Sequence, residues 1–97
     1  MFIQTEQTPN PQTLKFLPGK VVMYEGTAFY QNIDEARDSP FARRLFVIDG
    51  VEGVFFGSDF ITITKSSSCE WQVMKPSIIG GIIDHFNSED KTIERTA

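Results

Sequence analysis

Residues 51–65, VEGVFFGSDFITITK, constrain the fold more than any other part of the sequence. Both halves have the β-branched and aromatic content of strands, and Gly57, Ser58 and Asp59 between them have the turn chemistry of a tight hairpin. In the second half isoleucine alternates with threonine, so the apolar side chains share one face of the strand. The segment predicts an antiparallel pair whose apolar face must be covered by another layer.

The N-terminal residues predict a second hairpin. FIQTEQT and TLKFL read as strands, PNPQ between them is a turn by composition, and VVMYE reads as a further extended run. Pro9 and Pro11 push the residues before them into extended conformations, which makes the connector stiff and sets the register of the strands. We interpret residues 8–19, TPNPQTLKFLPG, first of all as a rigid corner that sets the hairpin register. Its exposed turn, formed by Pro9, Asn10 and Pro11, is a candidate docking surface for a partner.

Residues 26–38 predict a loop with one turn of helix, with an extended run over TAFYQNI as the alternative, and a short helix is predicted after them. Ser39 has the chemistry of an N-cap, Pro40 suits the first helical position and Gly50 is the stop. Phe41 and Leu45 lie at helical spacing, so the helix is amphipathic.

The last element is predicted to be a longer helix that ends near Phe86. Ser67 and Glu70 have the spacing of a capping box, and Pro76 either kinks the helix or marks a new start. The apolar stripe continues across the proline, which favours a kink. Gly80 and Gly81 predict a close approach of this helix to the sheet. One stripe carries Trp71, Lys75, Ile78, Ile82 and Phe86, with Met74, Ile79 and Ile83 beside it.

The predicted order of elements is therefore β-β-α-β-β-α. Short hairpins with helices that cover one apolar face predict an α+β two-layer sandwich with a mainly antiparallel sheet. The 97 residues suit one domain. We expect that domain to span residues 1–88, followed by a polar, disordered tail over 89–97.

Charge and composition limit the classes of function that the chain can have. The net charge of -4 and a pI near 4.8 disfavour nucleic-acid binding. No segment predicts a signal peptide or a membrane span, so we expect no membrane partner. A single cysteine, Cys69, points to a reducing compartment. The expected location is the bacterial cytoplasm, or the mitochondrial matrix after removal of a presequence.

No catalytic or metal-binding residue is predicted. Cys69 would lie in the first turn of the last helix, where unpaired N–H groups favour a thiolate, but His85 lies ~24 Å away at 1.5 Å per residue. We interpret Cys69 as an inert thiol and His85 as a charge or hydrogen-bond donor near a helix end. The nearby carboxylates Asp34, Glu35 and Asp38 are interpreted as a solvated patch.

Trp71, Lys75 and Pro76 form the second candidate docking surface. A core position for Trp71, with the Lys75 stem along the edge of the apolar stripe, is the simpler interpretation. A surface that contacts a partner is the alternative.

Several motifs, in order, carry a family resemblance. TPNPQTLKFLPG, SPFARRLF, GVEGVFFGSDFITITK and WQVMKP together resemble the N-terminal domain of the Nfu (NifU-like) iron-sulfur cluster scaffold and carrier family, over residues 2–86. The resemblance implies a non-catalytic role in assembling iron-sulfur clusters or delivering them, with cluster donor or recipient proteins as partners.

In that family a CxxC pair in a separate C-terminal domain holds the cluster, and this sequence contains no CxxC. The resemblance therefore implies no cofactor in this chain, an iron-sulfur cluster on a separate domain, and docking as the task of this one. The alternative is a stand-alone interaction or regulatory module unrelated to clusters.

Overall fold

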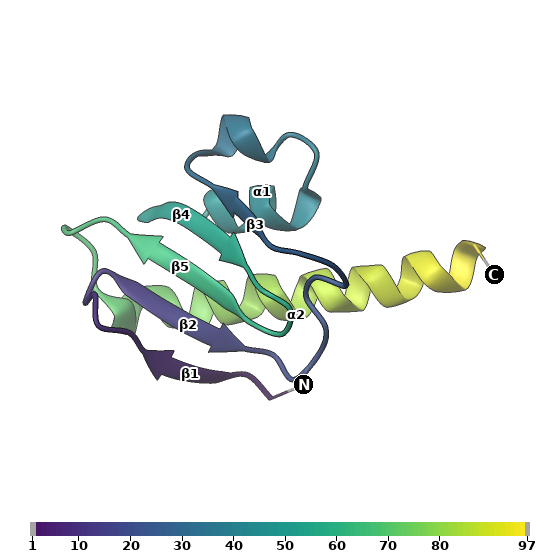
Figure 1. Cartoon of the computed structure of the whole chain (residues 1–97), viewed down its shortest axis with the longest axis horizontal. Helices are drawn as coiled ribbons and strands as arrows, with labels where there is room; N and C mark the ends of the chain where they lie inside the picture. Colours follow the sequence, from purple (N-terminus) through teal and green to yellow (C-terminus); the bar gives the residue numbers. More distant parts are fainter. Residues whose placement is uncertain (1, 97) are drawn as a thin grey trace.

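Five antiparallel strands form one sheet in the order β1-β2-β5-β4-β3, with the helices packed on one face (Figure 1). This computed structural model describes the backbone of residues 2–96 and the side chains of residues 2–88. The predicted class, an α+β two-layer fold with an antiparallel sheet, is confirmed. The strands are β1 (Gln4–Gln7), β2 (Thr13–Leu17), β3 (Ala28–Tyr30), β4 (Val51–Phe56) and β5 (Ile61–Lys65).

The strand β3 adds one element to the predicted order, which becomes β-β-β-α-β-β-α. It is three residues long, too short to show an alternating pattern, and pairs with β4 through Tyr30 and Val54. The expected extended run at residues 21–25 forms no strand. Instead, the N–H groups of Val22 and Met23 donate to the carbonyl of Ser58, which fastens this segment to the β4–β5 turn.

Both predicted hairpins are confirmed, and they meet in the middle of the sheet. Gln7 pairs with Leu14 at the end of the β1–β2 hairpin. The β4–β5 hairpin closes with a hydrogen bond of 2.9 Å from the Gly57 N–H to the Phe60 carbonyl. β2 then pairs with β5, so that residues from the two halves of the chain form adjacent central strands.

The first helix, α1 (Pro40–Phe46), begins as predicted. The Ser39 hydroxyl accepts a hydrogen bond of 3.2 Å from the Ala42 N–H, and Pro40 occupies the first turn. Before it lies one 3-10 turn, η1 (Ile33–Ala36), which fits the single helical turn expected there. After it, Gly50 takes a φ of +92°, a left-handed conformation that favours glycine.

The second helix, α2 (Trp71–Thr96), starts three residues later than a capping box at Ser67 requires, so that prediction is wrong. Ser66 stabilises a turn here in place of the first helical turn. Its carbonyl accepts a hydrogen bond from the Cys69 N–H, and its hydroxyl accepts one from the Ser68 N–H. The helix also continues through Pro76 and past Phe86, where the sequence predicted its end. A new start at Pro76 is therefore excluded.

The core lies between the sheet and the two helices. From α2 it receives Met74, Ile78, Ile82 and Phe86, all buried, which confirms this part of the predicted stripe. The predicted approach of the glycine pair to the sheet is wrong. A side-chain carbon on Gly81 would lie 3.4 Å from Leu45 of α1, and one on Gly80 would meet nothing within 4 Å.

The predicted tail, 89–97, falls outside the residues whose side chains the structure describes. Its disorder, and the domain limit at residue 88, stay predictions.

Candidate functional site

A groove of about 550 Å³ runs between the β1–β2 hairpin and the start of α2. β1 contributes Thr5 and Gln7 to it, since alternate residues of a strand share a face. The remaining lining residues are Thr8, Pro9, Pro11, Thr13, Leu14, Trp71 and Lys75. The groove is the place where two segments that are 60 residues apart in sequence come together.

The hairpin loop on one side of the groove is held by its own side chains. The Asn10 side-chain oxygen accepts a hydrogen bond of 3.0 Å from the Gln12 N–H, and the Thr8 hydroxyl accepts one of 3.2 Å from the Asn10 N–H. The Thr13 N–H closes the loop onto the Asn10 carbonyl at 3.0 Å. With the two prolines, these bonds make a rigid corner of the kind that the sequence predicted.

Trp71 joins the loop to α2. Its indole N–H donates a hydrogen bond of 3.0 Å to the Pro11 carbonyl, and its ring meets Phe16 of β2 edge to face at 6.5 Å. The side chain is half-buried, so the ring packs on the core while one edge faces the groove. The interpretation of Trp71 as a core residue is therefore only partly met, and contact of its ring with a partner stays a prediction.

The groove is locally cationic although the chain is acidic. Lys75 lines it, and Lys65 lies beside it with its ammonium 5.9 Å from the Trp71 ring. No Asp or Glu is among the residues that line the groove in the described part of the chain. The carboxylate on β1, Glu6, points to the other face of the sheet, where it lies 3.8 Å from Lys15. An anionic group would therefore enter the groove without meeting like charge.

The structure brings together four of the six predicted docking residues. Pro9, Pro11, Trp71 and Lys75 line the groove. Asn10 lies in the exposed loop beside it, and Pro76 is exposed on α2 without lining it. Sequence reasoning missed Thr5 and Gln7, although their positions two apart on a predicted strand just before the TPNP corner were the available signal.

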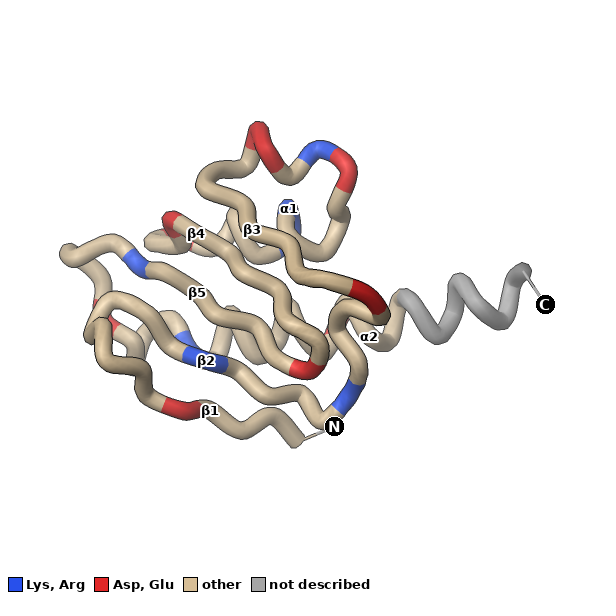
Figure 2. The backbone as a smooth tube through the Cα atoms, viewed as in Figure 1, with Lys and Arg blue, Asp and Glu red and all other residues tan. Residues whose placement is uncertain are grey.

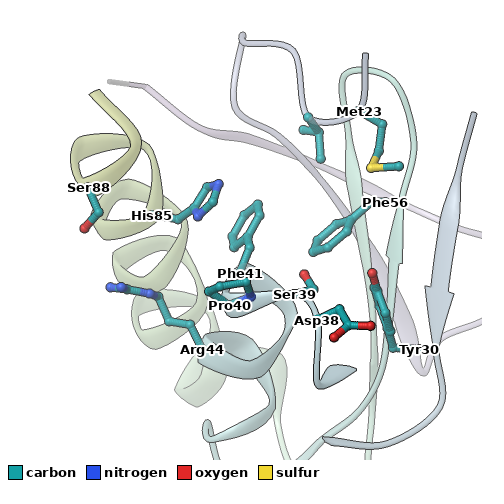
Figure 3. Close-up of a pocket in the computed structure, with 11 residues that line it drawn as sticks. Met23, Tyr30, Asp38, Ser39, Pro40, Phe41, Arg44, Phe56, His85 and Ser88 are labelled. Atoms are coloured by element: carbon teal, nitrogen blue, oxygen red, sulfur yellow. The ribbon is translucent and has the colours of Figure 1, made fainter. Parts of the chain in front are cut away.

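A second hollow, of about 410 Å³, lies where α1, α2 and β4 meet (Figure 3). The rings of His85 and Phe41 are stacked 3.7 Å apart, and Phe41 is stacked on Phe56 at 4.9 Å. His85 is thus a packing residue in the middle of a helix and not a group at a helix end, because α2 continues beyond it. These rings join the two helices to the sheet.

The structure shows where the cysteine and two of the carboxylates lie that we interpreted as inert or solvated. Cys69 is half-buried and precedes α2, so it does not lie in the first helical turn as predicted; its sulfur faces Gly50. Glu35 accepts a hydrogen bond of 2.8 Å from the Gln31 N–H and so helps to fix η1. Asp38 lines the second hollow.

Iron-sulfur clusters are held by several thiolates, and the chain has one cysteine. Among residues 2–88 there is also no group of three or more His, Cys, Asp or Glu placed to hold a metal ion. The described residues therefore do not fit a cluster.

Comparison with known proteins identifies the family. The model of the family described as scaffold protein Nfu/NifU N terminal matches residues 3–89. The chain belongs to this family. It is 50% identical over 88 residues to NifU-like protein 4, mitochondrial, of Arabidopsis thaliana, and 51% identical over 89 residues to the NFU1 iron-sulfur cluster scaffold homolog, mitochondrial, of Drosophila sechellia. Each match covers 91% of this chain and 31% of the relative, so this Nfu/NifU domain spans about a third of the length of those proteins.

Solved structures agree with the family. A NifU-like protein from Saccharomyces cerevisiae superimposes with a TM-score of 0.79 at 31% identity, covering 90% of this chain and 79% of that one. Protein SAV1430 from Staphylococcus aureus gives a TM-score of 0.72 at 23% identity, covering 84% and 99%, which shows the same fold.

The distribution of charge and hydropathy adds two observations. Lys and Arg are scattered over several elements of the described chain and do not gather in one stripe (Figure 2). Across the described residues, no helix combines the length and the apolar character that a membrane crossing requires.

Proposed function

We propose that this Nfu/NifU N-terminal domain is a non-catalytic docking module that serves iron-sulfur cluster assembly and delivery. The observation that carries the proposal is identity of about half over 91% of the chain with relatives named as NifU-like proteins and as an iron-sulfur cluster scaffold homolog. Because the described residues do not fit a cluster, the ligands are proposed to lie on a separate domain, and this one positions a cluster donor or recipient protein.

The groove between β1 and α2 is the proposed docking surface. It is concave, it is edged by a loop that its own hydrogen bonds hold, and it is lined by the half-buried ring of Trp71. A preformed surface loses little conformational entropy on binding, which favours affinity from a small area. The word mitochondrial in the relatives' names favours the mitochondrial matrix over the bacterial cytoplasm as the proposed location.

The test is cluster transfer by a two-part protein. The domain would be joined to the C-terminal remainder of the Arabidopsis relative, loaded with cluster, and mixed with an apo recipient protein. We expect faster transfer than from the remainder alone. Lys75→Glu should remove the gain, whereas Lys20→Glu, the same charge change at an exposed position away from the groove, should leave it. Equal rates with and without the domain would contradict the docking role.

The stand-alone interaction module is the competing function. The two-part experiment separates them, because a module unrelated to clusters would bind partners without altering transfer.

A further inference from the structure

We propose that the segment recognised by the groove is an extended peptide that adds to the free edge of β1 and places an acidic side chain against Lys75. This inference rests on the proposed docking function and specifies the partner's element. It is argued from the edge of the sheet, from the position of the groove behind it, and from the charges in it.

The sheet ends at β1, and that edge is available for pairing. β1 pairs only with β2 among the described strands, and nothing lies beyond it in the view of Figure 1. An edge strand presents backbone N–H and C=O groups to any other extended chain. The opposite edge, β3, is shorter, with three residues, and lies beside η1.

β1 lacks three of the devices that often protect an edge, namely a proline, a lysine and a bulge. Its sequence, QTEQ, contains no proline or lysine, and its pairing with β2 runs without a bulge. Its single charge, Glu6, faces away from the groove toward Lys15. The edge is therefore open to strand addition, a mode in which backbone hydrogen bonds give affinity and pockets for alternate side chains give specificity.

The groove lies where those alternate side chains would go. Thr5 and Gln7 of β1 form one wall, and Trp71 and Lys75 of α2 form the other. A strand added beside β1 continues the pleat, so every second side chain points to the helical side of the sheet. Apolar side chains would meet the Trp71 ring.

The charge of Lys75 determines which side chain of the incoming strand would lie next to it. Lys75 is half-buried, lines the groove, and has no carboxylate within ion-pair distance among residues 2–88. Because no Asp or Glu lines the groove, an aspartate or glutamate of the incoming strand is its natural counter-charge, and a lysine there would be repelled. The proposed partner segment is thus extended, and the strand face that it turns toward the groove carries an acidic residue with an apolar residue two positions before it and another two positions after it.

The probe is a pair of synthetic peptides, TVTETVT and TVTKTVT, in which the valines and the central charge share one strand face. Each would be added to the 97-residue chain while amide exchange is followed by NMR. We expect the β1 amides that point away from β2 to exchange more slowly as TVTETVT is added, by mass action, while those of β3 do not change. TVTETVT should bind roughly threefold more tightly than TVTKTVT, the value of one exposed ion pair.

Charge exchange makes the test specific. In the Lys75→Glu variant the preference should reverse, with TVTKTVT the tighter peptide, whereas Lys20→Glu should keep the original order. Three outcomes would overturn the proposal. They are binding without slower exchange of the β1 amides, no binding of either peptide, and a preference that Lys75→Glu does not change. If the peptides fail but Lys75→Glu still slows cluster transfer, the docking function stands with another partner element. If the peptides bind and transfer is unchanged, strand addition stands and the docking function fails.

Discussion

Replacing Trp71 with phenylalanine should reduce stability without altering the fold. The change deletes the indole N–H, which donates a hydrogen bond of 3.0 Å to the Pro11 carbonyl, but it keeps an aromatic ring against Phe16. A net hydrogen bond contributes about 0.5–1.5 kcal/mol. The Pro11 carbonyl is exposed and rehydrates, so no further penalty for a buried unpaired group applies. The smaller ring also covers about 30 Å² less apolar surface, or roughly 0.7 kcal/mol. The free energy of unfolding should fall by about 1.5 kcal/mol.

The assay is urea unfolding followed by far-UV circular dichroism, because Trp71 is the only tryptophan and its fluorescence disappears with it. The midpoint should fall while the slope with urea stays constant, as it does when stability alone changes. Val73→Ala is the matched control in the same helical turn, since Val73 is 75% exposed, and it should change stability by less than about 0.5 kcal/mol. A loss for Trp71→Phe below about 0.3 kcal/mol, or above about 3 kcal/mol, would refute the assignment of Trp71 as a half-buried link.

Four further predictions follow from the backbone and from the single thiol. Gly50→Ala should lower the free energy of unfolding by about 2–4 kcal/mol, since φ is +92° and the new carbon would lie 2.6 Å from the Cys69 sulfur. Gly80→Ala, where the new carbon would meet open space, should raise the free energy of unfolding by about 0.5–1 kcal/mol in the same urea assay. Pro76→Ala should raise the free energy of unfolding by about 1–3 kcal/mol, and with it the thermal midpoint, because it restores an N–H inside α2. An unchanged midpoint would mean that the helix bears no strain there. Anaerobic incubation with iron and sulfide, then desalting, should leave no bound iron, whereas stoichiometric iron lost in Cys69→Ala would show that Cys69 is a ligand.

The sequence predicted those elements whose local chemistry agrees with the tertiary structure. Ser39 as N-cap and Pro40 in the first turn both favour a helix start at this point, and the alternation in residues 61–65 favours a strand with one buried face. β3 was predicted only as an extended alternative within a loop, because three residues carry no period and the strand depends on tertiary pairing with β4. The start of α2 was misplaced because Ser66 and Ser67 suit a turn as well as a cap.

The candidate site was predictable in part for a similar reason. The TPNP corner and the WQVMKP segment are each visible as unusual local sequences, and four of their residues line the groove. That they face one another depends on the packing of α2 against the β1–β2 hairpin, and no local pattern encodes a contact across 60 residues. The contribution of β1 follows only from the sheet order.

The central place of β5 has a consequence for synthesis of the chain. β2 leaves the ribosome before β5 and closes a hairpin with β1 within microseconds, but its other edge pairs with β5, whose last residue is Lys65. At usual elongation rates the intervening residues take roughly 2–10 seconds to appear. A lone two-stranded hairpin is marginally stable, so during this interval its apolar residues Leu14 and Phe16 have no core to enter. Chaperones that hold extended, apolar segments would have their longest opportunity here, before the second half of the domain emerges.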